Sequence, residues 1–164
     1  QQNVIEALPL LIKEFPEIHY HIVGKPDNKA NLISIAKNLN INKNITFHGA
    51  VSNSEKYALL SKSDMFVMLS QQTSDGDVEG FGIAILEANS IGVPAIGAKN
   101  CGIEDAILDK KSGMLINNQN ANEFKTAITT IMENYVSYSS EAIDWSKKFD
   151  WNSIIKQYIK IIEL

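Results

Sequence analysis

Apolar positions along the chain fall into two alternating patterns, short continuous runs and longer stretches with helical spacing. A short apolar run bounded by glycine or turn residues predicts a buried strand, and apolar residues three and four positions apart predict a helix. We expect strands at 18–23, 45–48, 65–69, 93–97 and 113–116. We expect helices at 1–15, 32–39, 53–60, 79–91, 102–108, 121–131 and 140–149, and a last helix from 152 onward.

Strands and helices therefore alternate along the whole chain. Short apolar strands that are each followed by a helix predict a parallel sheet covered on both faces, which is a doubly wound α/β fold. The pattern opens on a helix, whereas a doubly wound unit normally opens on a strand. We therefore expect that the first strand lies upstream of Gln1, and that residues 1–164 form a single domain of a larger protein.

Composition narrows the function. The chain has 45% hydrophobic and 21% charged residues and a net charge of −4, and all 15 of its basic residues are lysine. Without arginine there is no guanidinium fork for guanine or phosphate, so nucleic acid is not an expected partner. Cys101 is the only cysteine, which excludes an internal disulfide and a cysteine-based metal site and fits a cytoplasmic protein. No apolar run is long enough to span a membrane.

The stretch from Asp75 to Glu87 carries the most specific chemistry. A loop rich in aspartate and glycine follows an apolar strand and leads into an apolar helix. A strand, a glycine-bearing loop and a helix N-terminus together form an anion site, because the first helical N–H groups point at the ligand. Glu87 is the only charged residue from Gly80 to Val93, so we expect a buried carboxylate that needs hydrogen-bond donors from the protein or from a ligand's hydroxyls.

Other polar residues favour plainer interpretations. Asp75 and Asp77 fit turn chemistry better than a metal site, and no metal is expected. His19 and His21 alternate along a strand without a ligand partner nearby, and His48 stands alone, so core or surface positions are favoured over catalysis.

The residues from 79 to 87, Glu-Gly-Phe-Gly-Ile-Ala-Ile-Leu-Glu, resemble the E-x7-E signature of the group 1 (family 4) retaining glycosyltransferases of GT-B fold. Neighbouring blocks resemble the same family in order and spacing. They are Ile22-Val23-Gly24, Ile45 to Ser52, Ser63 to Val67, Gly92 to Ile96, Gly113 to Ile116 and Phe149-Asp150-Trp151. The resemblance covers essentially the whole chain.

The resemblance implies the C-terminal half of a two-domain enzyme, which binds a nucleoside diphosphate sugar in bacterial polysaccharide or glycolipid synthesis and needs no cofactor. Carried over, Glu79 is the catalytic-site residue that binds the donor sugar, and the backbone of Gly80, Phe81 and Gly82 faces the diphosphate. Glu87 accepts from the ribose hydroxyls. Gly24 lets the chain pass close to the donor, and Val51 contacts the base.

The sequence departs from the family pattern in two places. The family's basic pair, an arginine and a lysine beside the diphosphate, belongs to the strand and loop expected upstream, so Lys25 and Lys99 are the nearest remaining cations. The family's G-G-x-P-E loop is here Cys101-Gly102-Ile103-Glu104-Asp105, which lacks one glycine and the proline.

We therefore expect weak nucleotide binding and no sugar transfer by these residues alone. The acceptor-binding N-terminal domain would complete the enzyme and would carry any peripheral contact with the inner membrane. Two alternatives remain: a non-catalytic module that senses nucleotide sugars, and a nucleotide-sugar epimerase of GT-B fold.

Overall fold

The structure is a computed structural model that describes residues 1–26, 28–70 and 80–162. Its helices are α1 (Gln2–Glu14), α2 (Lys29–Asn38), α3 (Asn53–Leu60), α4 (Ile83–Ser90), α5 (Ala121–Glu133), α6 (Tyr135–Ser146) and α7 (Trp151–Ile162). Its strands are β1 (Tyr20–Val23), β2 (Ile45–Gly49), β3 (Phe66–Met68), β4 (Ala95–Ala98) and β5 (Gly113–Ile116). Short 3₁₀ turns are η1 (Asn42–Asn44), η2 (Gly102–Ala106) and η3 (Lys147–Phe149).

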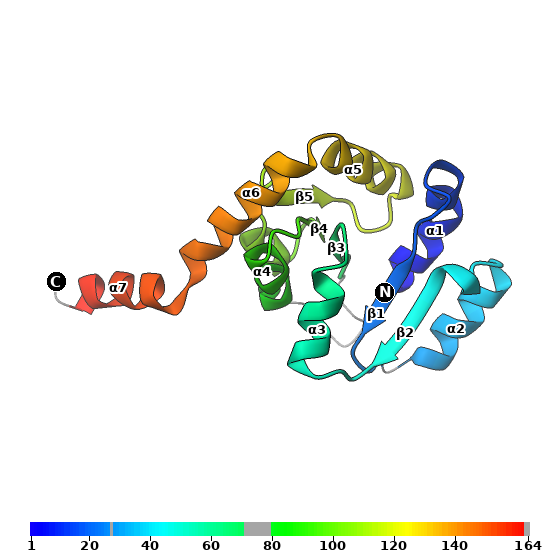
Figure 1. The fold of residues 1–164 in the computed structure, drawn as a ribbon, viewed down its shortest axis with the longest axis horizontal. Helices are drawn as coiled ribbons and strands as arrows, with labels where there is room; N and C mark the ends of the chain where they lie inside the picture. Colours follow the sequence, from blue (N-terminus) through cyan, green and yellow to red (C-terminus); the bar gives the residue numbers. More distant parts are fainter. Residues whose placement is uncertain (27, 71–79, 163–164) are drawn as a thin grey trace.

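The five strands form two separate sheets, β1-β2 and β3-β4-β5, and the strands within each sheet are parallel (Figure 1). No backbone pairing joins β1 to β3 among the described residues. The α/β architecture that the sequence predicted is confirmed, and Rossmann-like connectivity follows from the helices between successive strands. What the sequence did not predict is that the sheet is interrupted between its two parts.

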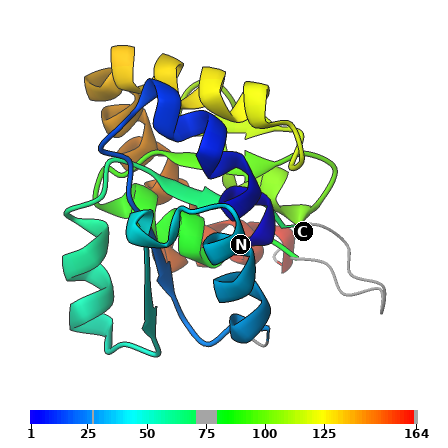
Figure 2. The same cartoon turned by 90° about the vertical axis from the view of Figure 1, so that its right-hand side faces the viewer.

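Helices cover both faces of the strands. On one face α1 packs against α2 and α5, and in Figure 2 α1 (dark blue) lies between α5 (yellow) and α2 (lighter blue). On the other face α4 packs against α6 and against β3 and β4. The larger core lies beneath α1 and α5 and includes Ile5, Leu8, Ile96 and Ile131, all fully buried.

Local sequence signals explain where several helices begin. The Ser52 side chain accepts from the backbone N–H of Glu55, whose carboxylate accepts in return from the Ser52 backbone, so the predicted capping box is confirmed. Asn120 caps α5 through the N–H groups of Asn122 and Glu123. Helix α6 begins at Tyr135, five residues earlier than expected from position 140, because only the capping residue Asn134 separates it from α5, which ends at Glu133.

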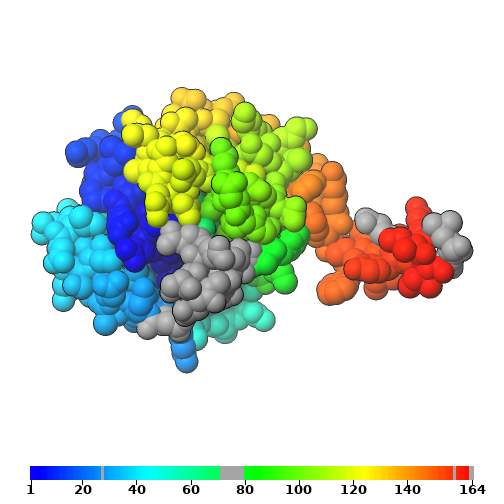
Figure 3. Space-filling model, turned by 180° about the vertical axis from the view of Figure 1, so that it is seen from behind, coloured from blue at the N-terminus to red at the C-terminus, as the bar shows by residue number. Residues whose placement is uncertain are grey.

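The last helix is largely exposed. Its apolar stripe favours a core position by sequence, and the resemblance implies that part of it packs on the other half of the enzyme; in the structure Trp151 is 75% exposed and Ile162 79% exposed. Figures 1 and 3 show α7 extending away from the rest of the domain, and it contacts mainly η3. Most of this stripe is therefore not covered by other described residues.

Candidate functional site

The loop before α4 is shaped by glycine. Gly82 occupies the N-cap of α4 with φ +86°, a left-handed conformation that other residues adopt only with strain. A Cβ on Gly82 would lie 2.9 Å from Ile85 Cδ1. Because the first-turn N–H groups of a helix lack partners inside the helix, this end of α4 suits an anion. The Phe81 ring packs on Phe149 with centroids 5.4 Å apart, so only the backbone of Phe81 remains to face a ligand.

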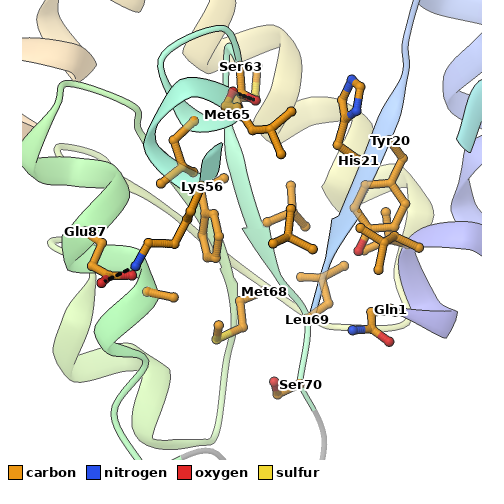
Figure 4. Close-up of a pocket in the computed structure, with 18 residues that line it drawn as sticks. Gln1, Tyr20, His21, Lys56, Ser63, Met65, Met68, Leu69, Ser70 and Glu87 are labelled. Carbon is orange, nitrogen blue, oxygen red and sulfur yellow. Dashed lines mark hydrogen bonds and ion pairs between the residues drawn. The ribbon is translucent and has the colours of Figure 1, made fainter. Parts of the chain in front are cut away.

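Glu87 lies in the middle of α4 and is where the sequence-based expectation needs correction. We expected a buried carboxylate, but the Glu87 side chain is 30% exposed. Its Oε1 accepts from Lys56 Nζ at 2.6 Å, and Lys56 belongs to α3 (Figure 4). Helix α4 is apolar nearly all round, yet Glu87 lies on the side that faces α3, where the cover is incomplete. The protein itself thus supplies one donor.

Glu87 and Lys56 both line a cavity of about 460 Å³ in the gap between the two sheets. Tyr20 to Val23 of β1 form one wall, and Met65 to Ser70 form the other (Figure 4). A second cavity of about 650 Å³ is lined by parts of the same two strands and by α1 and α5. The gap between β1 and β3 is therefore lined by two cavities, and Glu87, the predicted ribose acceptor, lies at the edge of the first.

The remaining predicted residues occupy the carboxyl ends of the strands. Gly24 follows β1 with φ +107° and donates its N–H to Gly49 O at 2.8 Å, and no atom lies within 4 Å of the position of a Cβ. Val51 is half-buried and lies just before the Ser52 cap, but it does not line the cavity beside Glu87. The structure thus brings β1's end and Glu87 to one cavity and places Val51 outside it.

The remaining predicted residues are the acidic residues before Gly80, two lysines and the loop from Cys101. Glu79, together with Asp75 and Asp77, lies outside the described residues. Lys25 and Lys99 are exposed, and neither forms an ion pair with a described residue. The loop from Cys101 onward is the 3₁₀ turn η2, with Ile103 fully buried under β4.

The three histidines form a cluster that the sequence did not reveal. His21 Nδ1 lies 2.9 Å from His48 Nε2, and the rings of His19 and His21 are 4.7 Å apart. His19 Nε2 also lies 2.8 Å from Thr46 Oγ1. The expectation that His48 stands alone is wrong, because the parallel pairing of β1 and β2 brings residues 27 positions apart onto one face. Among the described residues, no group of three or more His, Cys, Asp or Glu is suited to hold a metal ion.

Acid is expected to destabilise the domain through this cluster. Burial, together with the nearby His19 and His48, lowers the pKa of His21 below its usual 6.5. The unfolded chain therefore binds a proton at a higher pH than the folded chain does, and the stability present above pH 6.5 is lost as the pH falls through the lowered pKa. The melting temperature should fall less for His21→Asn than for the native chain between about pH 7.5 and about pH 5. Equal falls, or an NMR titration midpoint for His21 at or above 6.5, would contradict the prediction.

The described residues contain no helix that is long and apolar enough to cross a membrane.

Comparison with known proteins adds the family. The family model for glycosyl transferases group 1 matches residues 1–148. Over 133 residues the chain is 29% identical to a GDP-mannose-dependent α-(1-6)-phosphatidylinositol monomannoside mannosyltransferase of Mycolicibacterium smegmatis, covering 80% of this chain and 35% of that protein. It is 24% identical to the colanic acid biosynthesis glycosyltransferase WcaL of Salmonella typhimurium, described there as putative, over 97% of this chain and 40% of that protein.

Solved structures show the same fold. HepE from Anabaena, in complex with UDP and glucose, superposes with a TM-score of 0.79 at 22% identity, over 99% of this chain and 44% of that one. TarM superposes with a TM-score of 0.77 at 25% identity, over 96% of this chain and 31% of that one. The chain thus spans between 31% and 44% of the length of these four proteins. The architecture is that of the Rossmann-like C-terminal half of a GT-B enzyme, and the chain belongs to the group 1 glycosyltransferases.

Proposed function

We propose that this domain binds the nucleoside diphosphate sugar of a retaining hexosyltransferase that acts in polysaccharide or glycolipid synthesis. The observation that carries the proposal is the position of Glu87. Its carboxylate is 30% exposed and belongs to the helix that follows β3 through the left-handed turn at Gly82, the kind of strand-to-helix connection at which ligands bind in open α/β sheets. A carboxylate accepts hydrogen bonds only, so it suits the hydroxyls of a ribose.

The other roles are carried over from the resemblance. The glycine-rich entry to α4, with Gly82 in a left-handed conformation, presents backbone N–H groups to a diphosphate. Gly24 leaves open space where β1 ends, and Val51 is assigned to the base. Glu79 is assigned to the donor sugar and the reacting centre. No metal or cofactor is required in this scheme.

The relatives support the donor class. The mycobacterial relatives are named as GDP-mannose-dependent enzymes, and the HepE structures hold UDP or UDP-glucose. These names differ in base and sugar but share a nucleoside diphosphate. We therefore assign the class of donor, with the base left to the experiment that follows.

Nucleotide titration tests the proposal. We expect UDP or GDP to bind the native chain more weakly than micromolar, because the basic residues that the family places beside the diphosphate are absent from these residues. Glu87→Gln should weaken the binding of the better nucleotide roughly tenfold, since a hydrogen bond to a charged group is worth about 1.5–3 kcal/mol. Chemical-shift titration by NMR measures both affinities.

The matched control is Glu133→Gln, an exposed carboxylate in the last turn of α5. It should leave the affinity unchanged. The proposal fails if neither nucleotide perturbs the resonances of α4 and the end of β1, or if the two variants behave alike.

We further propose that a strand upstream of Gln1 fills the gap between the two sheets. Among the described residues β1 pairs only with β2 and β3 only with β4, and both strands line the gap, so each presents one backbone edge to it. Gln1 lines the cavity beside Leu69 and Ser70, at the carboxyl end of β3, so a strand that led into α1 would end at the right place.

A strand in this position gives the order β2-β1-new-β3-β4-β5, a continuous parallel sheet. The acceptor-binding domain would then precede it in the chain. Because the reaction would take place between the two domains, residues 1–164 should transfer no sugar by themselves. An assay of these residues with a labelled donor and a range of acceptors would refute this if transfer were detected.

A further inference from the structure

The side chain of Lys56 links two helices, α3 and α4, at the candidate site. Helix α3 carries no fully buried residue, and its start is fixed by the Ser52–Glu55 capping box. From the first turn of this outer helix, the Lys56 side chain crosses to α4 and reaches Glu87 across 31 residues of sequence. Figure 4 shows the two side chains pointing toward one another at the rim of the cavity.

The contact has the features of an organised pair rather than of two loose surface charges. Nζ and Oε1 are 2.6 Å apart, and the Lys56 and Glu87 side chains are only 26% and 30% exposed. The Lys56 ammonium also lies 5.1 Å from the centre of the Tyr57 ring, which adds a cation–π attraction. The ammonium is therefore held from two sides.

The pair leaves half of the carboxylate open. Each carboxylate oxygen has two lone pairs, and Lys56 engages Oε1 only. Among the described residues, none donates a hydrogen bond to Oε2. Since Lys56 tethers one oxygen, rotation of the carboxylate is restricted, and Oε2 remains as the acceptor for hydroxyl donors.

We infer that Lys56 is a positioning residue for nucleotide recognition, which holds the Glu87 carboxylate so that its open oxygen accepts from the ribose hydroxyls. The inference rests on the proposed function and adds to it the residue that sets the selectivity for ribose. Lys56 acts through Glu87 and does not itself contact the ligand.

The test compares ribose with deoxyribose in the full-length protein. UDP and GDP are titrated beside their 2′-deoxy and 2′,3′-dideoxy analogues, and the ratio of dissociation constants reports the hydroxyl contacts. In the native protein we expect removal of the hydroxyls to weaken binding roughly tenfold or more. In Lys56→Met this penalty should shrink to about threefold or less, because the carboxylate is no longer held in place.

Two further variants separate positioning from folding. Lys56→Arg keeps a donor and should restore most of the discrimination, whereas Lys37→Met, which removes an exposed lysine from α2, should leave it at the native value. A variant that merely destabilised the domain would weaken ribose and deoxyribose nucleotides alike.

The outcomes distinguish the inference from the proposed function. If the native protein binds no nucleotide, the proposed function fails. If it binds with full hydroxyl discrimination and Lys56→Met keeps that discrimination, only the role of Lys56 is overturned. Loss of discrimination in Lys56→Met with recovery in Lys56→Arg supports the inference.

Discussion

Replacement of Gly113 by alanine is expected to lower the free energy of unfolding by about 3 kcal/mol, at the upper end of ordinary overpacking. Gly113 opens β5 and pairs with Ala95 of β4, which is fully buried. A Cβ on Gly113 would overlap the backbone O, C and N atoms of Ala95. Backbone atoms cannot rotate out of the way as a side chain can, so β4 and β5 would have to separate.

Urea unfolding of the two chains measures this effect. A loss of about 3 kcal/mol corresponds to a fall in melting temperature of roughly 6–12 °C for a domain of this size. Gly80→Ala is the matched control, because no atom lies within 4 Å of its Cβ position and its backbone is not left-handed. A Gly113→Ala chain that unfolds like the control would show that β4 and β5 are less closely paired than described.

Addition of the proposed strand between β1 and β3 should raise the stability of the domain, and this is the second large effect that we expect. The 164-residue chain is compared with the same chain extended before Gln1 by the proposed strand. Burial of about three apolar side chains of a new strand favours folding by roughly 1.5–3 kcal/mol each, and the ordering of the strand cancels much of that gain. The melting temperature should still rise by about 5 °C or more.

Hydrogen exchange locates the effect. Amides of β1 and β3, which flank the gap, should gain more protection than those of β2 and β5, which do not line it. A version of the extension with aspartate at its central apolar position should lose the gain. Unchanged exchange in β1 and β3 would refute the inserted strand, and concentration-dependent protection of the 164-residue chain would instead assign the gap to a second copy.

Local signals in the sequence predicted most of the architecture. Strands such as β4 and β5 are short apolar runs ended by turn residues, and the caps at Ser52 and Asn120 define their helices without reference to anything distant. These features depend on residues that are close together in the chain, so the sequence alone is enough to predict them.

The contacts at the candidate site depend on residues far apart in the chain. Lys56 and Glu87 are separated by 31 positions, and His21 and His48 by 27, so neither pair has a spacing that marks it. The exposure of Glu87 was misjudged for a related reason. An apolar helix predicts burial overall, but which of its sides remains uncovered depends on where α3 lies. The roles of Gly80, Phe81 and Gly82 came from the resemblance, and the structure adds the left-handed turn at Gly82.

The projecting helix α7 has an energetic consequence. A helix of 12 residues is only marginally stable in water, because the cost of nucleation is barely repaid over three turns. With Trp151, Tyr158 and Ile161 exposed, little tertiary packing contributes to it. The α7 amides should therefore exchange hydrogen independently of the core in the isolated chain. Their protection against exchange would report assembly, because it should rise only when another surface covers the apolar face of α7.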